Sequence, residues 1–192
     1  MAKARISGMI LVVALVSLST SAAKAQVVGR CIAETQYSTI QAAVNAAQSG
    51  SVIKVCPGDY SEQVVIEKPL TLEGITSQGV EGVLIVHPAN GLVVNDSTWA
   101  AQLLVKNTSG VMISNLIVDA AGNPPACTSP AVIGIVFHNA SGTVNNVVSG
   151  NAITETCAGI LTTGTGSNEL SGNAFNALYV STLNATTCGP IF

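Results

Sequence analysis

Few residues in this chain are suited to acid–base or metal chemistry. Its two histidines, His87 and His138, each lie near the end of a predicted strand, without a carboxylate, serine or cysteine at a spacing that makes a catalytic pair. A structural role is therefore predicted for both. The cysteines form no CxxC pair and no paired His–Cys spacing, so the pattern predicts no metal site; they lie at positions 31, 56, 127, 157 and 188.

Aromatic side chains, which bind sugars by stacking, are also few. The single tryptophan, Trp99, follows a polar segment at 95–98 and lies between two apolar strands. Its ring could contact a glycan from an exposed loop or pack over the neighbouring coil, and the sequence leaves both roles open.

The N-terminal segment predicts export. Lys3 and Arg5 precede an apolar run at 9–16, and an A-x-A cleavage site ends at Ala25, so residues 1–25 have the pattern of a secretory signal peptide. The apolar run is too short to span a bilayer, and no comparable run follows. We therefore expect a secreted, periplasmic or extracellular protein that is not embedded in a membrane.

The charge distribution argues against nucleic acid and anionic lipid as partners. The whole chain has a formal net charge of -3, and loss of residues 1–25 would remove basic residues but no acidic residue. The remaining chain is thus more acidic, and no basic surface is expected. A polyanionic glycan would also be repelled overall, unless a local cation or a basic groove compensated.

An amphipathic helix and then short strands follow the signal segment. Ser38 or Thr39 can cap the start of the helix, and Gly50 is placed for a left-handed cap at its end. The helix has one apolar stripe at helical spacing, made by Ile40, Ala43, Val44 and Ala47. Apolar runs typical of strands come next, at 52–55, 64–66 and 70–72. One helix followed only by short strands indicates a lid on the end of a stack.

An internal similarity supports a stack of repeated coils. Residues 102–110 align with 134–142, which would place Val105 over Phe137 in the next coil. The spacing exceeds one coil, and the segment AGNPPACTSP at 121–130 is the predicted insertion. Its prolines favour an external loop over a strand.

A second similarity aligns residues 147–153 with 169–175, which would place Val148 over Leu170. Asparagines recur at predicted turn positions in both pairs of aligned segments. Stacked asparagines commonly satisfy backbone groups inside bends, so a structural role is predicted for Asn107, Asn139, Asn151 and Asn173.

The segment 37–74 resembles a known family. It combines YSTIQAAV at 37–44, PGDYSE at 57–62 and KPLTLEG at 68–74. This order is similar to the N-terminal cap and first coils of the pectin-lyase-like superfamily, which includes pectin methylesterases. The resemblance implies an all-β fold, a right-handed parallel β-helix (solenoid) with an N-terminal capping helix. The length of the chain after Gly50 predicts about six coils.

The implied domain plan has three parts: a signal peptide at 1–25, an N-terminal strand and capping helix at 26–50, and β-helix coils at 51–192. The C-terminal residues offer neither a helix nor a charge run to cover the last coil, although solenoids usually cap their ends. We therefore expect a chain that is truncated at the C-terminus, or one that is capped by a partner or by self-association.

Order along a solenoid predicts the disulfides, which export makes plausible. Cys31 would pair with Cys56 at the cap, and Cys127 with Cys157 one coil apart. Cys188 is then left as a buried free thiol, or its partner lies outside this sequence.

The G-x-Y-x-E motif of the esterase family lies near the substrate groove without supplying the catalytic carboxylates. Carried onto this chain, the resemblance implies that Tyr60 contacts a sugar ring with Glu62 beside it. The same residues also suit a structural turn, in which Gly58 provides a permissive φ, Tyr60 packs under the cap and Glu62 is exposed.

Methylesterase chemistry needs an aspartate nucleophile, a second aspartate, oxyanion-binding glutamines and an arginine. The family motifs that carry them, Q-A-V-A, Q-D-T-L, D-F-I-F-G and G-R-P-W, are absent, and no arginine follows Arg30. Asp119 comes nearest to a nucleophile, with Lys106 as its only basic neighbour in sequence. A turn residue at the start of the insertion is its alternative role.

Lyases of this superfamily combine a strong base with calcium-binding carboxylates. The corresponding set here is Lys106 as the base, with Asp96 and Asp119 holding Ca²⁺. Glycoside hydrolysis in this fold uses clustered aspartates with G-H-G and R-I-K segments, and none of these occurs. No other cofactor is predicted.

These observations predict a secreted β-helix protein without catalytic activity, which contacts polysaccharide or acts as a surface-interaction module. The alternative is a pectinesterase-like or polysaccharide lyase-type carbohydrate-active enzyme, whose remaining essential residues would lie in a longer protein.

Overall fold

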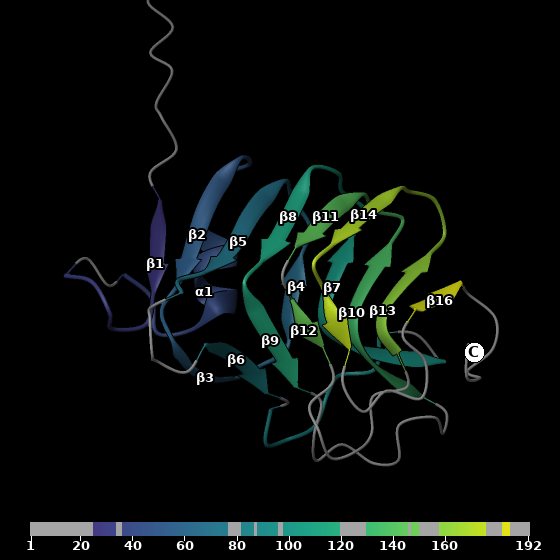
Figure 1. Cartoon of the computed structure of the whole chain (residues 1–192), viewed down its shortest axis with the longest axis horizontal. Coiled ribbons are helices and arrows are strands. Elements are labelled where there is room, and N and C mark those ends of the chain that lie inside the picture. Colours follow the sequence, from purple (N-terminus) through teal and green to yellow (C-terminus); the bar gives the residue numbers. More distant parts are fainter. Residues whose placement is uncertain are drawn as a thin grey trace, which may run out of the picture.

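The protein forms a parallel β-solenoid with one short helix at its N-terminal end (Figure 1). This computed structural model describes residues 25–33, 36–76, 82–86, 88–95, 98–119, 130–145, 147–149, 158–175 and 182–184. The predicted signal peptide falls almost wholly outside these residues and stays a prediction. Within the described part of the chain, no helix has the length and apolar character needed to cross a membrane.

Three sheets run along the solenoid, and all strand pairs within them are parallel. Sheet A contains β1 (Gln26–Val28), β2 (Ser51–Val55), β5 (Leu70–Gly74), β8 (Val111–Ser114), β11 (Gly142–Asn145) and β14 (Asn168–Ser171). Sheet B contains β3 (Gly58–Ser61), β6 (Val83–Val86), β9 (Leu116–Asp119), β12 (Val148–Ser149) and β15 (Ala174–Phe175). Sheet C contains β4 (Val64–Ile66), β7 (Trp99–Lys106), β10 (Ala131–His138), β13 (Ala158–Thr163) and β16 (Thr182–Asn184).

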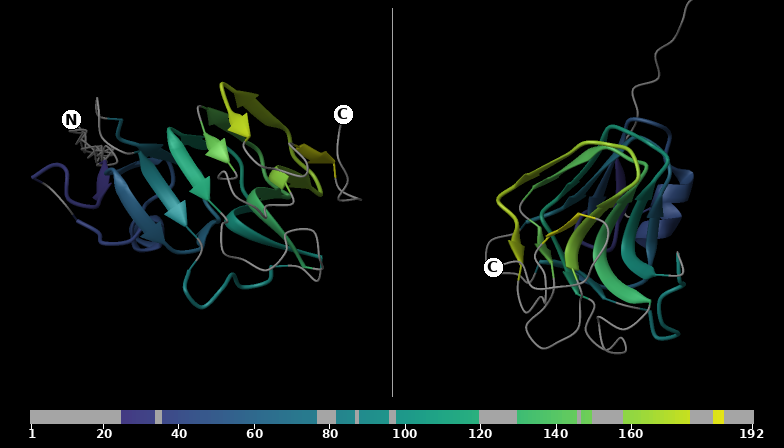
Figure 2. Two further views of the ribbon diagram at one scale, coloured as in Figure 1. Left: turned by 60° about the horizontal axis from the view of Figure 1, so that its bottom comes forward. Right: turned by 90° about the vertical axis from the view of Figure 1, so that its right-hand side faces the viewer.

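From β2 onward the chain passes through sheets A, B and C in turn and then re-enters sheet A one level further along. Figure 2 shows this progression as strands that change from purple to yellow along the stack. The predicted right-handed parallel β-helix is therefore confirmed. The predicted count of about six coils was not exact, because sheets B and C each contain 5 described strands. Long connections from sheet B to sheet C, such as 87–98, make several coils longer than expected.

The core fills the inside of the solenoid because side chains alternate along each strand. Ile53, Leu72, Ile113 and Val144 are paired in register on successive strands of sheet A, and all four are fully buried. The strands predicted at 52–55, 64–66 and 70–72 are confirmed as parts of β2, β4 and β5.

The ladder register confirms one of the two internal similarities. Val105 pairs with Phe137, as the first similarity predicts. The second prediction was wrong, because Leu170 pairs with Val144 and Val148 pairs with Ala174. The serine of the aligned S-G-N motif ends a strand of sheet A in one copy, at Ser171, but a strand of sheet B in the other, at Ser149, so the two copies are not at equivalent places in the coil.

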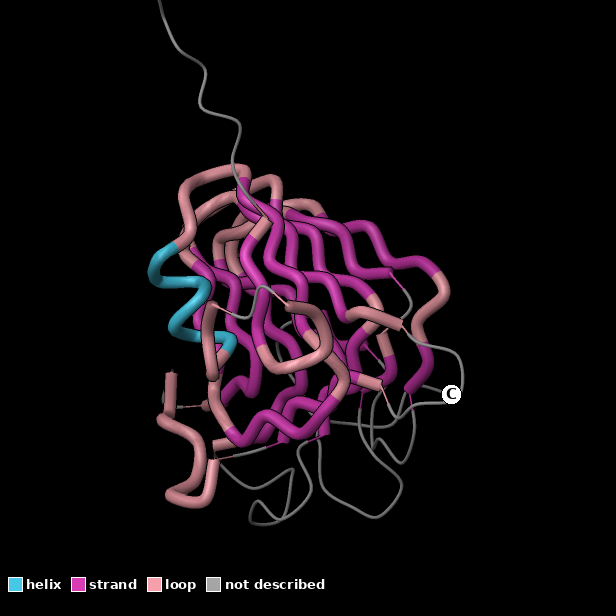
Figure 3. The backbone as a smooth tube through the Cα atoms, turned by 90° about the vertical axis from the view of Figure 1, so that its left-hand side faces the viewer, coloured by secondary structure: helices cyan, strands magenta, loops and turns pink. Residues whose placement is uncertain are grey.

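Helix α1 (Ile40–Ala46) lies at the N-terminal end of the solenoid, as Figure 3 shows from that side. Its predicted apolar stripe is buried. Thr39 is the N-cap, since its hydroxyl accepts a hydrogen bond from the Ala42 amide at 3.2 Å. The predicted cap at Gly50 was wrong, because the helix ends at Ala46 and its C-cap residue, Ala47, is extended.

Candidate functional site

Tyr60 lies at the N-terminal end of the core and uses its hydroxyl within the protein. Only 8% of the residue is exposed, and the phenol donates a hydrogen bond to the Cys56 carbonyl at 2.8 Å. Burial raises the pKa of the phenol above its ordinary value of 10.0, and the nearby charge of Glu62 raises it further. Gly29, with φ of +86°, passes so close that a side chain there would meet the Tyr60 hydroxyl.

Glu62 caps the helix that lies over this end of the core. Its carboxylate accepts hydrogen bonds from the amides of Ile40 at 2.7 Å and Gln41 at 2.8 Å. The alternative role from the sequence, an exposed Glu62 beside a turn, is thus corrected: the side chain is half-buried, and residues 58–61 form strand β3. A carboxylate is favoured here because the first amides of a helix have no partner within it. Sugar binding by Tyr60 and Glu62 stays a prediction.

Two further side chains fasten the helix to the first coil. The Gln41 carboxamide accepts from the Val65 amide at 2.6 Å and donates to the Val65 carbonyl at 3.2 Å. It thus satisfies both backbone groups of Val65 on β4, as a neighbouring strand would. Lys68 donates from Nζ to the carbonyls of Ala47 at 2.9 Å and Asn45 at 3.2 Å, at the end of the helix. The motif residues at 57–74 therefore hold the cap in place.

The predicted disulfide between Cys31 and Cys56 is confirmed, and it ties the segment after β1 to the turn between β2 and β3. The predicted pair Cys127–Cys157 and the unpaired Cys188 lie outside the described residues.

The structure does not bring Lys106 and Asp119 together. Lys106 ends β7 in sheet C, where its ammonium lies 3.1 Å from the Glu67 carboxylate. Asp119 ends β9 in sheet B and is buried, with a partner within the protein. The two residues thus end strands of different sheets, and they form no ion pair with each other. Asp96 lies outside the described residues, so the proposed calcium set stays a prediction.

Trp99 packs on the outer side of sheet C. Only 8% of the residue is exposed, and its ring centroid lies 6.0 Å from that of His138. The two ring nitrogens of His138 form hydrogen bonds with Thr163 Oγ1 at 2.7 Å and Asn139 Nδ2 at 3.2 Å. His138 thus has the structural role predicted for it. Of the two roles left open for Trp99, the structure shows packing, and stacking on a glycan stays a prediction.

Part-way along β7, the side chains that face the core change from one alternating set to the other. Leu103 and Val105 face the inner core, whereas Trp99, Ala101 and Leu104 belong to a second apolar cluster on the outer side. This switch of sides requires a bend near Gln102. The Gln102 side chain is fully buried and, among the described residues, has no hydrogen-bond partner. The sequence offered only one signal of this, a lone polar residue within an apolar run.

The described residues contain no group of three or more His, Cys, Asp or Glu side chains that could hold a metal ion.

Comparison with known proteins relates this chain to pectin methylesterases by structure. No family model and no curated sequence matches it. A pectin methylesterase variant in complex with a hexasaccharide has a TM-score of 0.52 and 16% identity, over 80% of this chain and 54% of that one. A pectin methylesterase with another hexasaccharide has a TM-score of 0.50 and 16% identity, over 80% and 54%. The pectin methylesterase PemA from Erwinia chrysanthemi has a TM-score of 0.50 and 18% identity, over 82% and 55%.

The chain thus spans about half the length of these solved structures. At this identity the likeness concerns the fold, since one fold hosts many activities. The protein has the right-handed parallel β-helix fold of the pectin methylesterases.

Proposed function

We propose that this protein is an exported β-helix protein that contacts polysaccharide without cleaving or de-esterifying it. Contact with polysaccharide is supported by the shared fold with pectin methylesterases, two of which were solved with hexasaccharides. Export is supported by the Cys31–Cys56 disulfide, because such bonds persist in oxidising compartments.

The observation that carries the non-catalytic part is the separation of Lys106 from Asp119. Both enzyme mechanisms considered need the two residues in one site, with Lys106 either as the cation beside the Asp119 nucleophile of an esterase or as the base beside a calcium-binding Asp119 of a lyase. Here the Lys106 ammonium is engaged by Glu67, and Asp119 ends a strand of a different sheet.

The test combines a binding assay and an activity assay on the purified protein. Affinity electrophoresis through gels that contain pectin, polygalacturonate or a neutral glycan should retard the protein in at least one gel. Incubation with methyl-esterified pectin should release no methanol, no unsaturated product and no new reducing ends. Retardation in none of the three gels would refute the proposal.

The alternative function, a pectinesterase-like or lyase-type enzyme, is favoured by the kind of proteins that share the fold. It predicts turnover that is lost in Asp119→Asn, a substitution of nearly equal size at a buried position. Turnover with that loss would replace the present proposal, and an accompanying loss with a calcium chelator would indicate a lyase.

We also propose that a partner or a second copy of the chain covers the C-terminal end of the solenoid. Leu170 pairs with Val144 on the inward-facing column of sheet A, yet 43% of Leu170 is exposed. Light scattering over a concentration series should show a rise in molar mass if copies associate through this end, and a constant monomer mass would exclude self-association.

A further inference from the structure

The first strand of the described solenoid begins directly after the predicted cleavage site. Ala25 completes the A-x-A pattern, is exposed and lies just outside β1. Gln26 is the first residue of β1 and pairs in register with Ile53 of β2. Removal of residues 1–25 would therefore leave a glutamine as the N-terminal residue, at the start of the first strand of sheet A.

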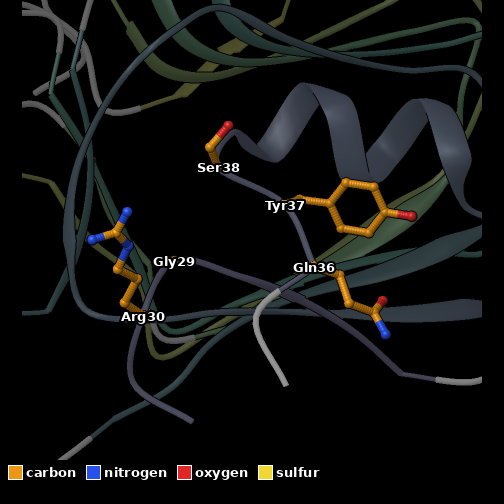
Figure 4. Close-up of a pocket in the computed structure, with 5 residues that line it drawn as sticks. All are labelled: Gly29, Arg30, Gln36, Tyr37 and Ser38. Carbon is orange, nitrogen blue, oxygen red and sulfur yellow. The ribbon is translucent and has the colours of Figure 1, made fainter. Parts of the chain in front are cut away.

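Strand β1 is held on both sides beyond its first residue. Val27 and Val28 are buried, and both pair with β2. On the other side of the strand, the Val27 carbonyl accepts hydrogen bonds from the amides of Gln36 and Tyr37, each at 3.1 Å. Figure 4 shows Gln36 and Tyr37 on the segment that passes beside Gly29, the residue after the strand. These contacts keep the beginning of the folded chain in a fixed place.

The Gln26 side chain is half-buried, and its carboxamide oxygen is not held by a hydrogen bond. Oε1 is buried and, among the described residues, has no hydrogen-bond partner. A buried oxygen without a partner costs stability. It also means that no hydrogen bond to this oxygen has to break when the carboxamide turns toward the amine of its own residue.

An N-terminal glutamine contains both reactants of an intramolecular acylation. An α-amine loses its proton more readily than a lysine side chain does, so part of it is the uncharged nucleophile near neutral pH. The amine nitrogen attacks Cδ of the side chain, which is close because both belong to one residue. The Nα–Cδ bond forms, the Cδ–Nε2 bond breaks, and Nε2 leaves as ammonia with a proton from the amine. The step needs no oxidant, reductant or second substrate.

From this placement we propose that Gln26 is the N-terminus of the exported protein and closes to pyroglutamate, the lactam of its α-amine and its side-chain carboxamide. The inference rests on export in the proposed function and adds a covalent modification to it. Closure removes the α-ammonium from the start of sheet A but leaves the carbonyl of Gln26 unchanged. Aminopeptidases that require a free α-ammonium then cannot trim β1, whose valines belong to the core.

The test is the intact mass of the protein collected after export by its own leader, measured before any digestion. We expect the mass of residues 26–192 less one ammonia, after allowance for disulfide hydrogens. Trypsin should then release residues 26–30 with the same deficit, because Arg30 is the first basic residue after the cleavage site. Stepwise N-terminal sequencing of this peptide should be blocked until pyroglutamyl aminopeptidase removes the ring, and should then begin at Val27.

Gln26→Asn is the matched control, because it keeps a carboxamide at the same position of β1. Its side chain is one carbon shorter, so the corresponding lactam is too small to close. The variant should show no ammonia deficit, and its sequencing should begin at position 26 without the aminopeptidase. An equal deficit in the variant would place the loss of ammonia elsewhere in the chain and overturn the site.

The starting residue and its mass separate this inference from the proposed function. An exported protein that begins with an open Gln26 would overturn the modification and leave export standing, and a start at another residue would overturn cleavage after Ala25. Retention in the cells with residues 1–25 attached would overturn export itself. A protein that carries the ring and is retarded in none of the glycan gels would overturn polysaccharide contact and leave the modification standing.

Discussion

Tyr60 and Glu62 both direct their polar atoms into the protein. The phenol bonds the Cys56 carbonyl, and the carboxylate bonds two helix amides. The motif that resembles esterases therefore has a complete structural explanation at this end of the solenoid. Two substitutions measure how much each residue contributes.

The raised pKa of Tyr60 predicts a loss of stability at high pH. Above pH 10.0 the unfolded phenol releases its proton while the folded phenol still holds it, so rising pH favours unfolding in the window between the ordinary and the raised pKa. Below this window both states are protonated and the effect is absent. Denaturant unfolding at a series of pH values should show a steeper fall above pH 10.0 for the wild-type protein than for Tyr60→Phe. Parallel curves would contradict the raised pKa.

Removal of the Glu62 carboxylate should loosen the helix cap. Glu62→Ala leaves the amides of Ile40 and Gln41 without their acceptor, and we expect the free energy of unfolding to fall by about 1–2 kcal/mol. Asp59→Ala is the matched control, because it removes an exposed carboxylate from the adjacent strand β3. Equal stability of the two variants in thermal unfolding would refute the capping role.

At the scale of elements, the turns from sheet C back to sheet A share one backbone conformation. Asn107 and Asn139 have φ of 53° and 48°, and Gly164 has φ of 71° at the equivalent place in the next coil. Asparagine tolerates this left-handed region better than most residues. The predicted bonding of backbone groups is confirmed for Asn139, whose Oδ1 accepts from the Thr165 amide, and for Asn173, whose side chain bonds the backbone of Val144 and Val147. For Asn107 the structure shows the left-handed backbone alone. Asn151 lies outside the described residues.

Substitutions at Asn139 should separate its backbone role from its side-chain role. Asn139→Gly keeps the left-handed conformation but loses the bond from the Thr165 amide to Oδ1, and should cost about 1 kcal/mol. Asn139→Ala should cost roughly 1 kcal/mol more, because it also strains the backbone. Asn107→Gly should cost less than Asn139→Gly, because the described residues give the Asn107 side chain no such bond. Thermal unfolding gives the order, and a more stable alanine variant would contradict it.

Across the whole molecule, the disulfide closes the N-terminal end of the stack. Cys31 and Cys56 are separated by 25 residues in sequence. Because the bond restricts the conformations of the unfolded chain, it should stabilise the fold by about 3 kcal/mol. The double variant Cys31→Ala, Cys56→Ala should lose about this amount in denaturant unfolding under oxidising conditions. A reductant that destabilises the double variant further would indicate the second predicted disulfide, and an unchanged double variant would contradict the contribution of the first.

The sequence alone determined the scaffold of this protein. The strand runs and the helical stripe at 40–47 follow from local periodicity, and the structure confirms them. The resemblance of segment 37–74 implied the solenoid, and order along that solenoid predicted the disulfide partner of Cys31, which is also confirmed. Tertiary structure alone decided that Lys106 pairs with Glu67, that Glu62 caps the helix and that the Tyr60 hydroxyl bonds the Cys56 carbonyl. These depend on how many residues each bend contains and on which coil lies beside which. A shift in register changes such contacts while leaving the local pattern of the sequence unchanged.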